Sequence, residues 1–339
     1  MLEAYYSAGS DNELTVYRLL DLLADGKMHG GPALARELGI SRSAVWKSIR
    51  QLSGLGLGVH SSRDGYQLVR SLEMLDADRI MGCLDEVNRS RIDVIIIHKS
   101  IDSTNSALMR RQYKSMNQFY VCAAEHQTAG RGRQGRTWHS PFGANLYLSI
   151  AWYCPVSPAS WNGLAIACSL AVAEALTNMG IDGLWVKWPN DLYFSDEKIG
   201  GILVEFRGEA EGPCVIVVGI GLNISMPATE HNPVDQPWRD LSSIIEGKTL
   251  SRNKVAGILI NALIQEMLSF AFSGFSGMIE RWKSWDRLIG REVAIHEADQ
   301  ISYAMVSGLD ESGALLVRGS EGMRRIVAGE VRLKWRDSR

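Results

Sequence analysis

The sequence lacks any segment that would direct the chain into or across a membrane. Its first residues, MLEAYYSAGSDNEL, contain neither a basic stretch nor an apolar core, which argues against a secretory signal peptide. No uninterrupted apolar run approaches the roughly 20 residues that a membrane-spanning helix needs. We therefore expect a cytoplasmic protein without a membrane partner.

Cysteine is also scarce, and its distribution shows no framework. The chain has five cysteines among its 339 residues, widely scattered, and no two are spaced as Cys-x-x-Cys. Disulfide scaffolds and structural zinc sites show paired and closely spaced cysteines, and thiols stay reduced in the cytoplasm. We expect buried free thiols and no fixed metal site.

Acidic residues are missing from a long central stretch of the chain. No Asp or Glu occurs between His126 and Ala173, although the segment 125–147, EHQTAGRGRQGRTWHSPFGANLY, carries three arginines between glycines. Glycine lets a backbone approach an anion closely, and guanidinium groups donate paired hydrogen bonds to phosphate or carboxylate oxygens. The segment predicts a mobile anion-binding loop whose arginines have no local acidic partner.

The same segment contains GRGRQG, which matches the dinucleotide-binding pattern G-x-G-x-x-G. That pattern requires a following helix and an acidic residue roughly 20 positions further on. Here Pro141 and Gly143 follow, then the strand-like run ANLYLSIAWY, and no acid is available. These features exclude the dinucleotide site. Taken alone, the segment is also compatible with a solvated Gly/Arg loop or an RNA-binding arginine tract.

Charge is distributed unevenly along the chain. The length suits two or three domains, and 46% hydrophobic with 22% charged residues is typical of a globular protein. The net charge is −2, yet residues 26–70 hold seven basic and two acidic residues, a local charge of +5 that leaves −7 elsewhere. A basic N-terminal module on an acidic body indicates a polyanionic partner for that module.

The basic module has the pattern of a winged helix-turn-helix. Residues 13–24 place Leu14, Tyr17, Leu20 and Leu23 on one expected helical stripe, and helices are expected at 31–39 and from Arg42. Two short strands around residues 63–65 predict a β-hairpin wing. A winged helix that binds protein instead of DNA is the alternative. The residues expected to contact DNA are Ser41, Arg42, Ser43, Trp46, Lys47, Arg50 and Arg63.

Three further stretches carry candidate ligand-binding groups. An apolar strand at 94–97 precedes Ser103, Thr104 and Asn105, which either simply cap a helix or hold a polar head group at its N-terminus. The turn KWPND at 187–191 leads to Lys198 and to the strand glycines at 200 and 201, which indicate close approach of a ligand or a second backbone. Taken alone, Lys198 is more often a solvated strand-end lysine, but opposite the arginine loop and beside two glycines it becomes a candidate ligand for phosphate or carboxylate.

The chain after Gly201 contains a further glycine-rich strand, a Pro-rich loop, two helices and a β-rich end. VGIGLN at 218–223 repeats the strand-glycine feature, and Trp238 lies in a Pro-rich loop at 226–240, as an anchor or as a stacking surface for a base. Helices are expected at about 251–272 and 277–288. From Arg291 onward, short strands predict a small β-barrel.

Together, GRGRQGRTW with SPFGANLYLS, KWPNDLYF followed by KIGGILVE, and VGIGLN behind a helix-turn-helix resemble the family of bifunctional biotin–protein ligases and biotin operon repressors. The resemblance covers residues 13–337. It implies an α+β fold with four parts: a winged helix-turn-helix at 1–70, a linker at 71–84, a catalytic domain at 85–287 with a mixed sheet like that of class II synthetases, and an SH3-like barrel at 288–339.

The resemblance also implies a two-step reaction. Biotin and Mg²⁺-ATP would give biotinyl-5′-AMP and pyrophosphate, and the biotinyl group would pass to a lysine of the biotin carboxyl carrier protein of acetyl-CoA carboxylase. Family members use bound biotinyl-5′-AMP as a corepressor, which promotes a homodimer that binds the operator DNA of the biotin biosynthesis genes. The resemblance assigns catalysis to Arg131, Arg133 and Lys198.

By the same resemblance, the ligand-contacting set is larger and includes an aromatic side chain that stacks on adenine. It comprises Ser103, Thr104, Asn105, Gln127, Arg131, Gly132, Arg133, Arg136, Asp191, Lys198, Gly201, Asn223 and Trp238. Two alternatives stay open: a ligase whose N-terminal module does not bind DNA, and a biotin-sensing repressor without catalysis. A lipoate ligase would share the fold, but GRGRQGRTW followed by KWPND favours biotin.

Overall fold

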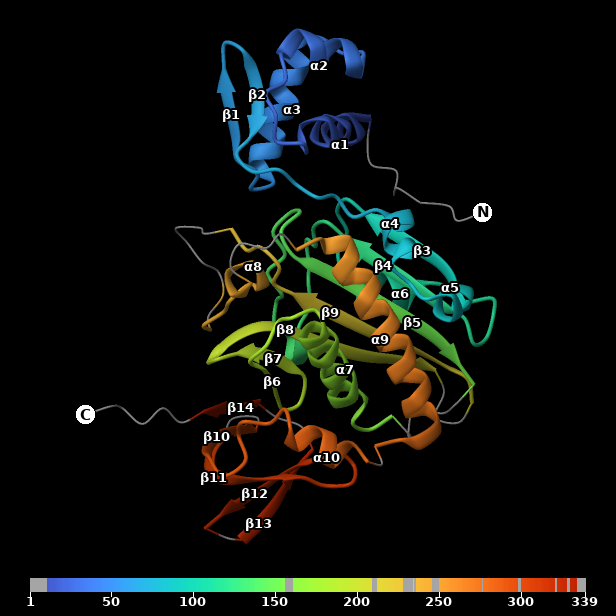
Figure 1. The fold of residues 1–339 in the computed structure, drawn as a ribbon, viewed down its shortest axis with the longest axis vertical. Helices are drawn as coiled ribbons and strands as arrows, with labels where there is room; N and C mark the ends of the chain where they lie inside the picture. Colours follow the sequence, from blue (N-terminus) through green and yellow to red (C-terminus); the bar gives the residue numbers. More distant parts are fainter. Residues whose placement is uncertain are drawn as a thin grey trace, which may run out of the picture.

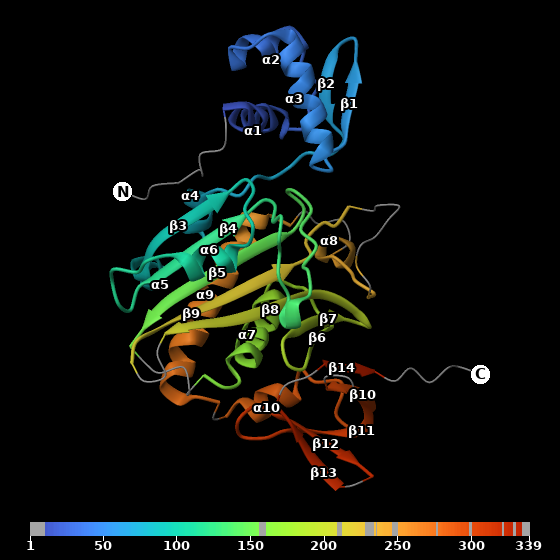
Figure 2. The same ribbon diagram turned by 180° about the vertical axis from the view of Figure 1, so that it is seen from behind.

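The computed structural model describes residues 11–155, 161–208, 212–227, 234, 236–245, 250–275, 277–297, 300–320, 322–327 and 330–333. Three bodies follow one another along the long axis of the molecule, as Figures 1 and 2 show from opposite sides. The N-terminal helices and hairpin lie at one end, a large mixed sheet with its helices lies in the middle, and a small β-rich body lies at the other end. This confirms the expected α+β fold class.

The N-terminal body is a winged helix. Its elements are α1 (Asp11–Leu23), α2 (Gly31–Leu38), α3 (Arg42–Gly54), β1 (Val59–Ser62) and β2 (Gly65–Leu68). Gly39 ends α2 with φ of 67°, and the Ser41 side chain caps α3 by accepting a hydrogen bond from the Ala44 N–H. These caps agree with the start and stop signals of the sequence.

The buried stripe of α1 differs from the expected one. Val16, Leu19, Leu20 and Leu23 form it, whereas Leu14 is 54% exposed. Buried positions on a helix follow the spacing i, i+3, i+4, i+7, and these four residues have that spacing. The expected stripe stepped by three residues throughout, so it drifted around the helix and its assignment of Leu14 was wrong.

The central body is built on a seven-stranded sheet in the order β3-β4-β5-β9-β8-β7-β6. The pair β3–β4 is parallel and the remaining pairs are antiparallel, so the sheet is mixed as expected. Its strands are β3 (Ile92–His98), β4 (Phe119–Ala124), β5 (Leu146–Cys154), β6 (Leu184–Lys187), β7 (Asp191–Phe194), β8 (Glu197–Gly208) and β9 (Cys214–Leu222).

Helices cover both faces of this sheet. On one face lie α7 (Leu164–Asn178) and α9 (Arg252–Ser273), and on the other lies α6 (Thr104–Arg110). The shorter helices are α4 (Ala77–Gly82), α5 (Glu86–Arg91), α8 (Leu241–Ile244), α10 (Met278–Lys283) and the 3₁₀ turn η1 (Arg133–Gly135). Although α9 is long and apolar enough to cross a membrane, Leu259, Ile260 and Leu263 are fully buried in the core, so it is a core helix.

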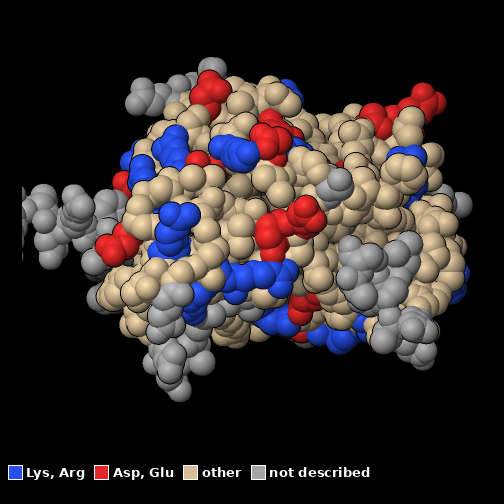
Figure 3. All heavy atoms as spheres, turned by 90° about the horizontal axis from the view of Figure 1, so that it is seen from below, with Lys and Arg blue, Asp and Glu red and all other residues tan. Residues whose placement is uncertain are grey.

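The C-terminal body is a five-stranded antiparallel sheet in the order β13-β12-β11-β10-β14. Its strands are β10 (Glu292–Glu297), β11 (Gln300–Leu309), β12 (Leu315–Gly319), β13 (Gly322–Ile326) and β14 (Glu330–Leu333). The apolar side chains inside it join the main core, and the Trp188 indole N–H donates to the Gly313 carbonyl at 3.0 Å. Figure 3, viewed from this end, shows Lys and Arg side chains interspersed with Asp and Glu.

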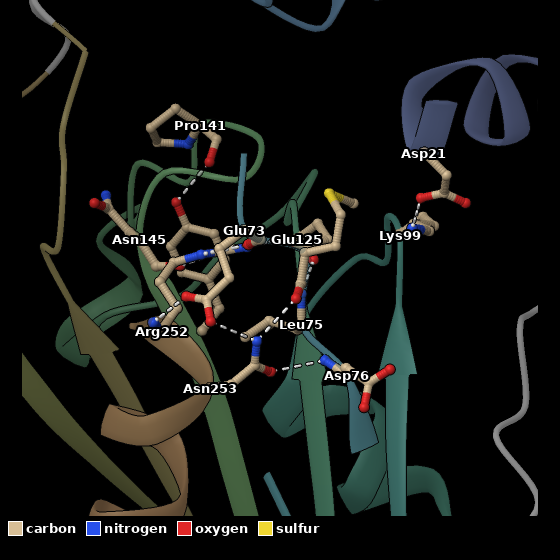
Figure 4. Close-up of polar contacts among 12 residues, drawn as sticks. Asp21, Glu73, Leu75, Asp76, Lys99, Glu125, Pro141, Asn145, Arg252 and Asn253 are labelled. Carbon is tan, nitrogen blue, oxygen red and sulfur yellow. Dashed lines mark hydrogen bonds and ion pairs between the residues drawn. The ribbon is translucent and has the colours of Figure 1, made fainter. Parts of the chain in front are cut away.

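A buried polar network fixes the linker that follows the winged helix to the central body (Figure 4). The Arg252 guanidinium, 4% exposed, pairs with the fully buried Glu125 carboxylate at 2.5 Å. The other Glu125 oxygen accepts the Leu75 N–H at 2.6 Å, and Arg252 also donates to the Glu73 and Asn145 carbonyls. The connecting segment 71–76 is therefore fixed to the start of α9 and to both ends of the Gly/Arg loop, the segment 125–145 between β4 and β5.

Candidate functional site

A cleft lies between the Gly/Arg loop, the first turn of α6 and strands β8 and β9. It holds about 750 Å³ of unoccupied space, a figure that includes space open to solvent. Eleven of the thirteen predicted ligand contacts line it: Ser103, Thr104, Asn105, Gln127, Arg131, Gly132, Arg133, Arg136, Asp191, Lys198 and Gly201. Sequence positions almost 100 residues apart thus meet in one site.

The first turn of α6 forms the polar floor of the cleft. Ser103 caps the helix, as the simpler reading of this tripeptide predicted. The Thr104 N–H donates to Gln127 Oε1 at 2.9 Å, and Ser149 Oγ lies 2.6 Å from Asn105 Oδ1 as a donor. A Cβ at Gly219 would come within 2.1 Å of Asn105 Oδ1, so this glycine on β9 makes room for the side chain.

The Gly/Arg loop folds down onto the sheet. Its tightest turn has two residues in the left-handed region, Gln134 with φ of 54° and Gly135 with φ of 73°. The Trp138 indole lies on Gly221 of β9, where a Cβ would come within 2.4 Å of the ring. Gly130 is equally constrained, since its Cβ would lie 2.6 Å from the Trp138 carbonyl oxygen. The glycines therefore serve close packing as well as a turn.

One arginine of the loop has an acidic partner after all. Arg131 Nη2 donates to Glu205 Oε2 at 2.6 Å, across 74 positions of sequence. The sequence offers the loop arginines no local acid, and the partner of Arg131 comes instead from β8, far along the chain. Arg133 Nη1 lies 3.3 Å from Asn190 Oδ1 as a donor, so a neutral group of the KWPND turn holds the second guanidinium.

Lys198 occupies the position that the strand-glycine pattern indicated. Its ammonium, on a side chain 12% exposed, pairs with Asp191 Oδ1 at 2.8 Å. It also lies 5.5 Å from the centre of the Trp138 ring. A cation this well enclosed interacts with a bound anion more strongly than one in water. The hairpin of β7 and β8 positions it, and Gly201 beside it keeps the cleft open.

Histidines and one aspartate near the loop have shifted pKa values. Burial lowers the pKa of His126 and of His139, so both imidazoles are neutral at physiological pH. Hydrogen bonds from Arg110 hold the pKa of the Asp102 carboxyl below its ordinary value, one residue before the α6 cap. Among the described residues, no group of three or more His, Cys, Asp and Glu side chains is placed to hold a metal ion.

Within the described part of the chain, two predicted contacts lie outside the cleft lining, Asn223 and Trp238. Asn223 Nδ2 donates to the Arg239 carbonyl at 3.2 Å and its N–H donates to Ile199, so the residue fixes segment 237–239 to β8. The backbone of Trp238 runs beside Lys198. Residues 228–233 and 235 of the predicted loop lie outside the described residues, and stacking by Trp238 stays a prediction.

The cleft also contains residues that sequence reasoning did not select. They are Thr137, Trp138, Asn190, Ile202, Leu203, Gly219, Ile220, Gly221 and Gln236. The alternation of β8 could have added Leu203, since side chains two apart share a face with Gly201. Trp138 and the β9 glycines were noted as features of their segments but were not assigned to the site.

Comparisons with known proteins match this architecture. Residues 97–223 match the biotin/lipoate A/B protein ligase family, residues 288–334 the biotin protein ligase C-terminal domain, and residues 15–67 an HTH domain. The bifunctional ligase/repressor BirA of Salmonella typhimurium is 40% identical over 93% of this chain and 96% of its own. The chain belongs to the BirA family of biotin protein ligases.

Other members of the family agree. The Escherichia coli bifunctional ligase/repressor BirA is 38% identical over 94% of this chain and 96% of its own. Among solved structures, the biotin protein ligase of Aquifex aeolicus in complex with biotin and ATP is similar with a TM-score of 0.60 and 28% identity. The superposed region comprises 71% of this chain and 98% of the Aquifex chain. The similarity therefore confirms the fold of the ligase part.

The helix-turn-helix of this BirA-family chain exposes the residues expected to contact DNA. Ser41, Arg42, Ser43, Lys47 and Arg50 are exposed on α3 or at its cap. Trp46 is 49% exposed, and the Arg50 guanidinium lies 5.0 Å from the centre of its ring. Arg63 projects from the turn between β1 and β2 with its side chain 95% exposed. The structure thus brings them onto two neighbouring features, the third helix and the wing.

Proposed function

We propose that the chain is a bifunctional biotin–protein ligase and transcriptional repressor. It activates biotin with ATP to biotinyl-5′-AMP and transfers biotin to a lysine of the biotin carboxyl carrier protein. The observation that carries this assignment is the convergence of Arg133, Arg136 and Lys198 on one cleft beside the first turn of α6. Family membership supports it, because the relatives at 38–40% identity are named ligase/repressors.

The charges in the cleft suit the first step. Attack of the biotin carboxylate on the α-phosphate of ATP brings two anions together, and negative charge increases on the phosphoryl oxygens. Lys198, Arg133 and Arg136 supply fixed positive groups at that place, which stabilises the transition state more than mobile water would. Mg²⁺ enters with ATP as part of the substrate. Neither a protein nucleophile nor a protein general base is needed, because the reacting groups belong to the substrates.

The closed loop suits the intermediate. Biotinyl-5′-AMP is a mixed anhydride and reacts readily with water, so a loop that covers it prevents wasteful hydrolysis. Packing of Trp138 on Gly221 and the tight turn at residues 134 and 135 hold the loop over the cleft. The same loop must then open at one side for the lysine of the carrier protein.

We further propose that the N-terminal module binds the operator DNA of biotin biosynthesis genes as a homodimer, with biotinyl-5′-AMP as the corepressor. Support comes from the local charge of +5 and from the exposed basic residues of α3 and the wing. Phosphate contacts by such residues provide most of the affinity for DNA. We place both activities in the cytoplasm, where carrier protein and operator are found together.

Pyrophosphate release tests the proposed enzyme activity directly. The purified protein is mixed with Mg²⁺-ATP and either biotin or lipoate, without an acceptor protein. We expect about one equivalent of pyrophosphate per active site with biotin and none with lipoate, because the adenylate is retained. Release with lipoate but not with biotin would identify the protein as a lipoate ligase. No release with either acid would mean that the cleft binds its ligand without catalysing a reaction, as in a sensor.

A further inference from the structure

The pairing of Arg131 with Glu205 joins the Gly/Arg loop to the sheet at one end of the cleft. The two side chains are 42% and 23% exposed, and the guanidinium nitrogen lies 2.6 Å from the carboxylate oxygen. Arg131 leaves the loop next to Gly132 and Arg133, which line the cleft. The guanidinium is therefore already bound to a carboxylate of the protein.

Glu205 is itself held in place by the first turn of α6. Its Oε2 accepts a second hydrogen bond from Asn105 Nδ2 at 2.8 Å, and Asn105 is only 4% exposed. Asn105 also donates to the Leu203 carbonyl and accepts from Ser149. The carboxylate thus belongs to the rigid floor of the cleft, whereas Arg131 belongs to the loop that covers it.

The loop meets the sheet at a second place. Trp138 lies on Gly221 of β9, and Lys198 lies 5.5 Å from the centre of its ring. Between these two anchors, Gly132 and Arg133 lie over the cleft. The anchors differ in kind, because the packing of Trp138 excludes water, while the Arg131–Glu205 pair is partly exposed. Ion pairs of this exposure are weak, worth about 0–1 kcal/mol, and open readily.

We propose that the Arg131–Glu205 pair is a latch that keeps the loop closed over the adenylate, and that Glu205 is a positioning residue acting through Arg131. This proposal rests on the proposed ligase function. Opening of the latch admits substrates, and its closure slows escape of biotinyl-5′-AMP before the carrier protein arrives. A weak pair serves this purpose because a strong one would also block the entry of biotin and ATP.

Glu205→Gln tests the latch. Glutamine keeps the size of the side chain and a hydrogen-bond acceptor but removes the charge that strengthens the bond to arginine. Without acceptor protein, the variant should still give a first burst of pyrophosphate with biotin. The slow release that follows the burst, which is limited by escape of the adenylate, should become up to about fivefold faster, equivalent to about 1 kcal/mol, the upper end for an ion pair of this exposure. Free biotinyl-5′-AMP in the filtrate, measured by chromatography, should rise in parallel.

Glu174→Gln is the matched control. Glu174 on α7 pairs with Arg281 at 2.7 Å, with side chains of similar exposure, 35% and 27%, but it lies away from the cleft. Its loss should leave the escape rate unchanged. Salt gives a second readout, because screening weakens exposed ion pairs. Raising the ionic strength should speed escape from the wild-type protein and have much less effect on Glu205→Gln.

The outcomes separate the latch from the proposed function. Absence of a burst in the wild-type protein contradicts the ligase assignment itself. A normal burst with equal escape rates in the wild type and Glu205→Gln overturns the latch. If Glu205→Gln does not fold, Glu205→Asp decides, because it keeps the charge but is one methylene shorter. Its escape rate should exceed the wild-type rate, and an unchanged rate overturns the proposal.

Discussion

At the scale of single residues, Lys198 is the cation on which adenylate formation should depend most. It is nearly enclosed, it lies beside Gly201, and the ion pair with Asp191 orients it. Removal of one preorganised charge of this kind costs about 100- to 1,000-fold in the rate of reaction. We therefore expect Lys198→Ala to lower the rate of the pyrophosphate burst by about 100-fold or more, as measured by rapid mixing.

Lys187→Ala provides the comparison, because Lys187 ends β6 and contacts Tyr193 outside the cleft lining. That variant should keep a burst rate close to that of the wild type. Lys198→Arg should recover only part of the activity, since the planar guanidinium does not reproduce a compact ammonium. A burst within twofold of the wild-type rate in Lys198→Ala would remove this lysine from the reaction.

Residue types predicted much of the site, and the structure explains why. Glycines at 130, 200 and 219 stood out in the sequence, and each proves to allow a close approach. The partner of Arg131 could not be predicted in this way. Glu205 reaches the loop only because β8 pairs with β9 in one particular register, and a pairing register is set by the whole sheet.

At the scale of elements, the first turn of α9 fixes three separate segments at once. Arg252 binds Glu125 at the start of the Gly/Arg loop, the Glu73 carbonyl of the linker, and the Asn145 carbonyl at the start of β5. Arg252→Met would leave the buried Glu125 carboxylate without its cation. Loss of one partner of a buried pair costs about 3–5 kcal/mol, so we expect a large fall in the apparent Tm, measured by calorimetry.

Two further variants interpret that result. Arg110→Met removes an arginine from an exposed pair with Asp102 and should lower the Tm less. Adding Glu125→Gln to Arg252→Met should recover part of the lost stability, because the uncompensated charge is then gone. If the double variant were as unstable as the sum of the two single ones, the charge would not be the cause.

The positions of the strands along the chain were easier to predict than the order in which the strands pair in the sheet. Strands on either side of the KWPND turn and through VGIGLN were expected in the regions of β6 to β9, because turn residues and apolar runs mark them. The insertion of β9 between β5 and β8 has no local signal. It follows from which apolar faces α6, α7 and α9 can cover together, and such packing depends on residues far apart in sequence.

At the scale of the whole molecule, the basic module should bind DNA through phosphate contacts. Lys47 is exposed on α3, so Lys47→Ala should remove about one counterion from the salt dependence of operator binding. Gel shifts with biotin and ATP present, over a series of salt concentrations, measure that slope. Pyrophosphate release should be unchanged, because Lys47 does not line the cleft and α3 lies at the opposite end of the molecule from the C-terminal body (Figure 1).

Lys114→Ala serves as the control for general loss of charge, since Lys114 is exposed on the central body. It should leave both the affinity for the operator and the salt slope unchanged. Equal weakening by both substitutions would mean that the module does not contact DNA through α3. Loss of pyrophosphate release in Lys47→Ala would show that the module and the catalytic domain are not separable as we propose.

The winged helix is held against the central body by few contacts, and these reach the Gly/Arg loop. The Tyr17 ring of α1 stacks on Phe142, just beyond the loop arginines, with centroids 6.3 Å apart. Asp21 pairs with Lys99 at 2.6 Å (Figure 4). Tyr17→Ala with Asp21→Ala should therefore release the module and speed tryptic cleavage after Arg70 by about tenfold, given the usual strength of aromatic pairs.

Leu14→Ala is the control, because Leu14 is exposed on the same helix and its loss should not change cleavage. Biotin with ATP should slow cleavage of the wild-type protein, since a loop ordered by the adenylate also fixes Phe142, and this protection should be lost in the double variant. Equal cleavage rates in the wild type and the double variant would contradict this account. The effect of ligand binding in the cleft would then be transmitted to the DNA-binding module through the buried Glu125–Arg252 network instead.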